Sequence, residues 1–260
     1  MKAIDINRHL NGLRSDLPAD TVDRVIFGDP EAEVKGIAVA WMPYRETIEQ
    51  ASKLGASVLV VHEPTFYDHW DLGGGLADLP EVAAKKVLIA EQGITIIRCH
   101  DIWDVMPEIG IPFAWGEFLQ LGDPVKRVRY HNLYEVPTQT AMSFARYIAG
   151  KTASLGQPVV AFYGDPNRPV ARVGLGTGCI SNPFDLYQLG ADLAISVDDV
   201  VRAWIAGEWC HDTGKPLVVV NHGVSEEPGM VSLARYLAQA FPQLPVTHLP
   251  QKCSFASVRA

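Results

Sequence analysis

Short apolar runs, rich in valine and isoleucine, recur along the chain and are separated by segments of helical length. The predicted strands span residues 36–41, 57–62, 95–99, 159–163, 170–175, 193–197 and 217–221. The predicted helices span residues 45–54, 80–92, 138–149, 183–189 and 227–241, with a weaker candidate at 199–207. Near-continuous apolar runs are typical of strands buried on both faces, as in parallel sheets covered by helices. The alternation therefore predicts an α/β fold. Residues 126–137 alternate apolar and polar side chains, which predicts a strand or hairpin that opens the second half.

Two stretches of the chain, one in each half, resemble each other in sequence. Residues 48–63 read IEQASKLGASVLVVHE, and residues 184–199 read FDLYQLGADLAISVDD. Each copy predicts an amphipathic helix, a Leu-Gly-Ala stop and a buried strand that ends in an acidic residue, with Gly55 and Gly190 suited to the left-handed residue that closes a helix. An apolar strand precedes each copy, and a helix and a strand follow it. We interpret this as two diverged strand-helix-strand-helix-strand units. The alternative is that such short sequence patterns are common to α/β proteins in general.

Charge and composition narrow the function classes. The 260 residues carry 22 basic and 30 acidic side chains, a formal net charge of −8, without a basic run. This balance argues against nucleic-acid and anionic-membrane partners. No apolar stretch is long enough for a membrane span, and the polar first residues do not read as a signal peptide. The four cysteines lie far apart without a C-x-x-C pair, which argues against a disulfide framework and a thiolate zinc cluster. We expect a cytoplasmic protein.

The strongest chemical signal is a histidine followed four residues later by an acid. His100 and Asp104 follow one predicted strand, and His222 and Glu226 follow the equivalent strand of the second copy. In open α/β sheets the carboxyl ends of strands face the ligand crevice. A residue placed four positions on, after a tight loop, can point back into the same space. Imidazole with carboxylate suits divalent Zn, Mn, Fe, Co or Ni.

A third strand end supplies His62 and Glu63. Six donors are too many for one tetrahedral ion and suit two ions that share a bridging carboxylate. The predicted metal ligands are His62, Glu63, His100, Asp104, His222 and Glu226. A single histidine at a strand end is usually a surface or capping residue, but a repeated spacing at three strand ends favours a paired-metal site.

The other polar residues carry weaker signals. His69 follows His62 closely, in a segment that would lean over the crevice, and is a candidate substrate contact or proton shuttle. Asp198 and Asp199 occupy the place equivalent to Glu63; they either hydrogen-bond to a ligand or cap a helix. We interpret the remaining histidines as structural: His9, His131, His211 and His248.

The glycine-rich stretch 174–179, GLGTGC, follows a predicted strand. Its spacing differs from the dinucleotide fingerprint, so a nicotinamide cofactor is not expected. We interpret it as a close approach of the backbone to the crevice, where its amides can hold an anion.

Together these residues resemble the Nif-three-like dinuclear-metal family, whose bacterial members are often labelled GTP cyclohydrolase 1 type 2 homologs. The resemblance runs nearly end to end. It rests on Leu-Gly-Ala followed by His62, on the H-x-x-x-D and H-x-x-x-E pairs, and on the turn Thr177-Gly178. Many members have two consecutive histidines where this chain has His62-Glu63, so Glu63 is the ligand that departs from the family pattern.

The resemblance implies two interlinked α/β lobes with a metal cleft between them. The first lobe would comprise residues 1–120 and the returning segment 227–260, and the second residues 121–226. It also implies a homohexamer.

Two functions from different classes follow. The first is a metal-dependent hydrolase of a small molecule such as a nucleotide, with two divalent ions per chain activating water and His69 moving the proton; GTP ring opening is what the family label suggests. The second is a non-catalytic metal-binding, partner-binding or regulatory protein. A nucleic-acid-processing role is disfavoured by the acidic balance.

Overall fold

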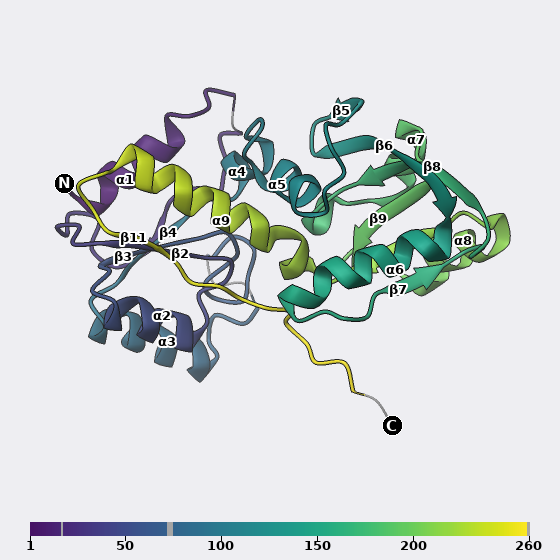
Figure 1. Ribbon diagram of the computed structural model, residues 1–260. Coiled ribbons are helices and arrows are strands. Elements are labelled where there is room, and N and C mark those ends of the chain that lie inside the picture. Colours follow the sequence, from purple (N-terminus) through teal and green to yellow (C-terminus); the bar gives the residue numbers. More distant parts are fainter. Residues whose placement is uncertain (17, 72–74, 259–260) are drawn as a thin grey trace. The chain divides into compact units, whose positions relative to one another are not determined.

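The computed structural model describes residues 1–16, 18–71 and 75–258 (Figure 1). The chain divides into two compact units, each with its own sheet. The first unit comprises Met1–Met106 and Met230–Gln251, and the second Pro107–Gly229 and Lys252–Ala260. No helix in the described ranges is long and apolar enough to cross a membrane.

The first unit contains a five-stranded sheet in the order β1-β4-β3-β2-β11. Its strands are β1 (Val25–Phe27), β2 (Ile37–Ala40), β3 (Val58–Val61), β4 (Thr95–Arg98) and β11 (Val246–His248). Strand β1 pairs antiparallel with β4, whereas β4 with β3, β3 with β2 and β2 with β11 pair parallel. Every residue of β2, β3 and β4 is buried, as expected for strands covered on both faces.

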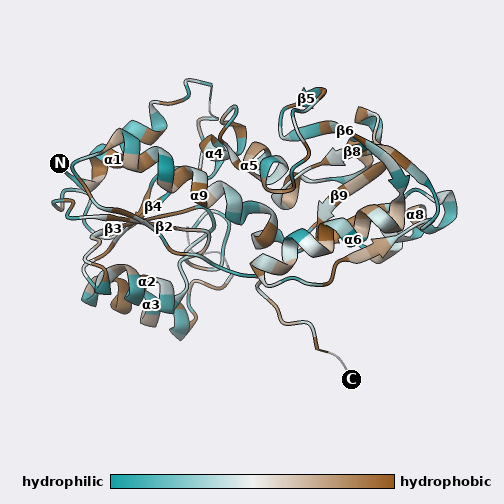
Figure 2. Ribbon diagram, in the orientation of Figure 1, coloured by the Kyte–Doolittle hydropathy of each residue, from teal (hydrophilic) through white to brown (hydrophobic). Residues whose placement is uncertain are grey.

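Helices cover both faces of this first sheet (Figure 1). They are α1 (Ala3–Asn11), α2 (Arg45–Lys53), α3 (Pro80–Glu91) and the second half of α9 (His222–Ala240), whereas the short helix α4 (Asp101–Val105) follows the carboxyl end of β4. Helices α2 and α3 pack on one face, and α1 contacts α9 through a 2.9 Å hydrogen bond between the His9 ring and the Tyr236 hydroxyl. Figure 2 shows the strands as mainly hydrophobic, whereas α2 and α3 carry both hydrophobic and hydrophilic positions.

The second unit contains a six-stranded sheet in the order β5-β6-β8-β9-β10-β7. Its strands are β5 (Lys126–Val128), β6 (His131–Thr140), β7 (Ala161–Tyr163), β8 (Pro169–Leu175), β9 (Leu193–Val197) and β10 (Leu217–Val220). The predicted hairpin at 126–137 is confirmed as the antiparallel pair β5–β6. The parallel strands β8, β9 and β10 form the centre, and antiparallel strands flank them.

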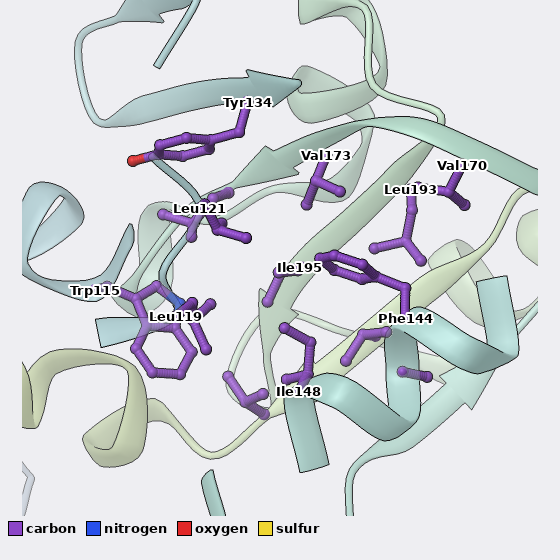
Figure 3. Packing of buried hydrophobic residues seen from close by; sticks show 14 of the residues in the cluster. Trp115, Leu119, Leu121, Tyr134, Phe144, Ile148, Val170, Val173, Leu193 and Ile195 are labelled. Carbon is purple, nitrogen blue, oxygen red and sulfur yellow. The ribbon is translucent and has the colours of Figure 1, made fainter. Parts of the chain in front are cut away.

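The helices of the second unit are α5 (Ile111–Phe118), α6 (Ala141–Thr152), α7 (Pro183–Leu189) and α8 (Glu208–Thr213), with the first turns of α9. Figure 3 shows Trp115 of α5 and Phe144 and Ile148 of α6 gathered over Val173 and Ile195 of the sheet, and all five are buried. The weaker helix candidate at 199–207 is a π-helical turn, Ala203–Gly207, that leads into α8.

The predicted repeat matches the topology of the two sheets. Strands β2-β3-β4 and β8-β9-β10 each lie side by side, parallel and in the same order, with a helix between the first two. Gly55 and Gly190 have φ of 78° and 115°, the left-handed conformation expected of them. The α/β fold predicted from the sequence is confirmed.

The unit boundaries differ in detail from the predicted lobes. Helix α5 lies before residue 121, yet its Trp115 packs in the core of the second unit. The last residues also belong to the second unit: Cys253 packs against the same core, and its amide donates to the Leu155 carbonyl at 2.9 Å.

Candidate metal centre

Three predicted ligands of the first unit lie together. His62 directly follows β3, and His100 follows β4 after one residue. Because β3 and β4 are parallel neighbours, their carboxyl ends meet at one edge of the sheet. One donor atom from each of His62, His100 and Asp104 lies within 4.8 Å of the other two. Two imidazoles and a carboxylate are a donor set that divalent transition metals accept.

The orientation of His62 suits an ion. Its Nδ1 lies 3.1 Å from the Cys99 carbonyl oxygen, and because a carbonyl only accepts, Nδ1 carries the proton. The other ring nitrogen, Nε2, therefore has the lone pair and lies 3.5 Å from Asp104 Oδ1. The His62 ring stacks on the His100 ring at 4.5 Å between centroids. A hydrogen bond that fixes one ring nitrogen and presents the other is the usual arrangement of metal-binding histidines.

His100 and Asp104 lie one helical turn apart, not across the tight loop that the sequence suggested. His100 caps the N-terminus of α4, and residues four apart on a helix share a face. The cap is held by Asp23, whose carboxylate accepts from the backbone amides of His100 and Ile102. Asp101 accepts at 3.0 Å from His100 Nδ1.

The charge on His100 depends on these acids. Burial lowers its pKa, but the carboxylates of Asp104, Asp101 and Glu63 more than offset burial and raise the pKa to about 9. Hydrogen bonds from His100 and Thr21 likewise outweigh burial at Asp101 and lower the pKa of that carboxyl. Without a metal ion His100 is therefore protonated at neutral pH, and an ion bound through it must displace the proton.

The second unit holds the equivalent pair. His222 is the first residue of α9, and Glu226 lies one turn further on the same face; the predicted helix therefore begins five residues earlier than residue 227. His222 Nε2 lies 3.1 Å from Glu226 Oε2, and Nδ1 lies 2.7 Å from Asp199 Oδ2. Burial lowers the pKa of His222, but Glu226 and Asp199 outweigh it and raise the pKa above its usual range.

Asp198 and Asp199 take different roles. Asp198 accepts at 2.8 Å from the backbone amide of His222 and so caps α9, whereas Asp199 accepts from the imidazole. The first unit repeats the arrangement, since Asp23 takes the amide of His100 and Asp101 takes its ring. In each unit one acid starts the helix and another orients the histidine.

The glycine-rich stretch approaches the second pair closely, as predicted. Gly178 has φ of 56°, and a Cβ added there would lie 2.5 Å from Glu226 Oε1 and 3.2 Å from His222 Nε2. The space beside these donors is therefore kept by the absence of a side chain. His131 supports the turn, because its Nε2 donates to the Ile180 carbonyl at 2.7 Å.

We expect Gly178→Ala to weaken metal binding by displacing Glu226, and to cost about 1–2 kcal/mol of folding free energy through the left-handed backbone. Isothermal titration with Zn²⁺ and urea unfolding measure the two effects. Gly214→Ala is the matched control: its φ is 66°, but an added Cβ meets nothing nearer than 3.5 Å. Equal metal affinity in both variants would contradict the proposed crowding at Gly178.

Glu63 is not part of the group formed by His62, His100 and Asp104, but one of its carboxylate oxygens lies within 4.8 Å of a donor nitrogen of His62. Its carboxylate is 3.8 Å from the guanidinium of Arg98, a side chain that is completely buried. Arg98 also donates to the carbonyl oxygens of His62 and His69 and lies 3.8 Å from Asp71. Arg98 therefore holds the chain on both sides of Glu63, whose role as a ligand stays a prediction.

Removing the buried guanidinium leaves two buried carboxylates without their cation. We expect Arg98→Met to destabilise the protein by about 3–5 kcal/mol, as the loss of one partner of a buried ion pair does. Arg172→Met is the control, because the Arg172–Asp192 pair is half exposed and its loss should change stability by about 1 kcal/mol or less. Urea unfolding midpoints of the two variants decide this, and similar midpoints would contradict the argument.

His69 lies beside the first-unit donors. Its ring is 5.8 Å from the His100 ring, and its pKa is lowered by burial and by the positive charges of Arg98 and His100. A neutral imidazole here can accept a proton. Of the histidines interpreted as structural, His9 of α1 stacks on Tyr236 of α9, and His211 is exposed.

Sequence reasoning missed several contributors. Asp101 had a local signal, because it directly follows His100. Asp23 and Arg98 had none, since their contacts join segments far apart in sequence. Cys179 was noted only within the glycine-rich stretch, but its thiol forms a group with Asp199 and His222 whose donor atoms lie within 4.8 Å of one another.

The chain is similar to one protein family and to several solved structures. The family model described as Duf34/NIF3 (NGG1p interacting factor 3) matches residues 1–253. The crystal structure of Staphylococcus aureus hypothetical protein SA1388 is similar over 99% of both chains, with 18% identity and a TM-score of 0.83. Reduced HcgD from Methanocaldococcus jannaschii is similar over 98% of both, with 17% identity and a TM-score of 0.71. TTHA1606 from Thermus thermophilus is similar over 98% of this chain and 100% of its own, with 19% identity and a TM-score of 0.70. A comparison with curated proteins gives no match.

Proposed function

Because the chain belongs to the Duf34/NIF3 family, we propose that it binds two divalent metal ions and hydrolyses a small phosphorylated molecule such as a nucleotide. The observation that carries the proposal is the repeated pair, His100 with Asp104 and His222 with Glu226, each on the first turn of a helix and each with a further acid on the imidazole. Such pairs offer divalent ions mixed nitrogen and oxygen donors.

The donors suit an ion on two further grounds. His62 donates from Nδ1 to a backbone carbonyl, which turns Nε2 towards Asp104. Gly178 leaves open the space that a Cβ would fill beside Glu226 and His222. When bound, a divalent ion supplies Lewis acidity that polarises substrate oxygens and lowers the pKa of water. That the donors of both units serve one paired centre stays a prediction, which spin coupling between bound Mn²⁺ ions in electron paramagnetic resonance spectra would test.

Two open pockets of the second unit support a small anionic substrate. One, of about 370 Å³, is lined by Asp199, Asn182 and Arg202, and the other, of about 600 Å³, by Asn182, Asp185, Lys126 and Arg129. Cationic and amide side chains of this kind bind phosphate oxygens. His69, held neutral beside His100, is the proposed proton acceptor. GTP ring opening is one member of this reaction class.

The alternative is a non-catalytic metal-binding or partner-binding protein, favoured by the family description, which names an interacting factor. A panel of nucleotides, phosphoesters and cyclic amides separates the two. A hydrolase should show metal-dependent turnover that His222→Ala abolishes while the far-UV circular dichroism is unchanged; His211→Ala, at an exposed histidine, should keep it. If metal-loaded protein turns over nothing on the panel, the binding function is favoured.

We also propose that the protein is a homo-oligomer, a hexamer by its resemblance to the family, and acts in the cytoplasm. Light scattering coupled to size exclusion tests the assembly, with six times the chain mass expected.

A further inference from the structure

Three donors of different chemistry meet on the second unit. Cys179 lies on the short turn Gly178–Ile180, Asp199 follows β9, and His222 begins α9. The thiol, one carboxylate oxygen and one imidazole nitrogen all lie within 4.8 Å of one another. Zn–S bonds of about 2.3 Å and Zn–N bonds of about 2.0 Å place two ligands of one ion up to about 4 Å apart, so small side-chain rotations suffice to bring the three atoms to one ion.

We propose that Cys179 is a thiolate ligand of the ion bound by the second unit, together with His222 and Asp199, so that this unit selects thiophilic ions such as Zn²⁺, Co²⁺ and Fe²⁺. The inference rests on the proposed metal binding and adds a ligand to it. It differs from the sequence prediction, in which His222 and Glu226 were the donors of this unit and sulfur had no role.

The thiol already interacts with the proposed partner. Its sulfur lies within 4.8 Å of a ring nitrogen of His222 and of a carboxylate oxygen of Asp199. The turn itself is fixed by the His131 ring on the Ile180 carbonyl and by the Ser181 hydroxyl, which donates to the Gly178 carbonyl at 2.8 Å. Cys179 is therefore held next to the imidazole and does not sit on a loose surface loop.

Cys179 also differs from the other thiols of the chain. Cys99 and Cys210 are buried, Cys253 is intermediate, and Cys179 is exposed. It lines the pocket of about 370 Å³ that Asp199 also lines, which gives an ion a path from solvent. On binding, the thiol proton passes to the buffer and the sulfur lone pair goes to the ion, so no oxidant or reductant is needed.

The two units should then differ in metal preference. In the first unit the described donor group is His62, His100 and Asp104, which offers nitrogen and oxygen without sulfur. Thiolate favours zinc, cobalt and iron, whereas carboxylate and imidazole alone discriminate less against manganese.

Cobalt substitution of the full-length protein tests the inference. We expect Co²⁺-loaded protein to show a thiolate-to-cobalt charge-transfer band in the near ultraviolet, and Cys179→Ser to lose the band while it still binds cobalt. Cys253→Ser, at another thiol of the same unit, should keep it. As a check that needs no variant, Zn²⁺ should slow alkylation of Cys179 by iodoacetamide by about tenfold or more, read by peptide mass spectrometry, because the metal holds the thiolate that would attack.

The outcomes separate the two proposals. Stoichiometric cobalt without the band, or a band that persists in Cys179→Ser, would overturn the thiolate ligand and leave metal binding intact. Protein that binds neither cobalt nor zinc would overturn both. Unchanged alkylation of Cys179 in zinc-loaded protein would count against the ligand even if Cys179→Ser failed to fold.

Discussion

His222→Ala is expected to weaken metal binding by the second unit more than about 100-fold, because losing only a hydrogen-bonding partner of a ligand already costs about 10–100-fold. The imidazole is the common neighbour of the acids in this unit, with Asp199 at Nδ1 and Glu226 at Nε2. Without it two carboxylates remain close together with no cation between them. Chelator competition with Zn²⁺ or Co²⁺ measures the loss of affinity.

The graded control is Asp199→Asn, which keeps the shape of the side chain and removes its charge. Its effect depends on its role. If Asp199 only orients the imidazole, the substitution should lower the metal affinity about 10–100-fold. If Asp199 is a direct ligand, as proposed with Cys179, the loss of affinity should be larger. His211→Ala, with a side chain that is 90% exposed, controls for the loss of a histidine as such. If His222→Ala and His211→Ala bind metal with equal affinity, the second unit does not bind the ion through His222.

The sheet centres could be predicted from the sequence because burial on both faces leaves little choice of residue. Strands β3 and β10 read as four consecutive branched aliphatic residues, and every one of them is buried. Other elements gave no such signal. Strand β1 has three half-buried residues, and α5 contains Gly116 and begins with a proline within its first turn, so neither shows a clear period.

Helix starts were the least predictable feature of the site. The residues after His222 and His100 show no apolar period, and Gly223 disfavours helix. What starts both helices is supplied from elsewhere in the chain: Asp198 accepts the amide of His222, and Asp23 those of His100 and Ile102. A capping residue that comes from a distant segment cannot be recognised in the sequence next to the helix. The sequence therefore predicted a loop after each histidine, where the structure has a helical turn.

The histidines themselves were predictable because the repeat carries them. Two copies of one unit place a histidine at the same strand end, and spacing along the sequence records that symmetry. The groups that tune them follow no such symmetry. Asp101 is adjacent to His100, whereas its counterpart Asp199 comes from the end of β9. The acid that accepts from the histidine ring therefore comes from a different position in each unit, and the structure is needed to identify it.

Metal affinity of the first unit is expected to rise with pH up to about 9, the pKa of His100, and then to level off with respect to this group. The ion needs the neutral imidazole, so each displaced proton contributes about tenfold in affinity per pH unit below that pKa. The His222→Ala variant isolates the first unit. Titrations in buffers with different heats of ionisation count the protons released, and release of none at pH 7 would contradict a protonated His100.

The same proton linkage makes the metal-free protein less stable as the pH rises from 6.5 to 9. The pKa of His100 is raised from 6.5 unfolded to about 9 folded, so its contribution is complete below pH 6.5 and is lost as pH rises through 9. The amount is on the order of 3 kcal/mol. Metal-free protein should therefore lose melting temperature between pH 6.5 and 9, and zinc-loaded protein should lose less, because the ion takes over the charge that the proton supplied. His100→Gln should make the profile of the metal-free protein shallower without flattening it, because His222, whose pKa is also raised, still contributes. His211→Gln should leave the profile unchanged, and identical slopes in these two variants would place the titration elsewhere.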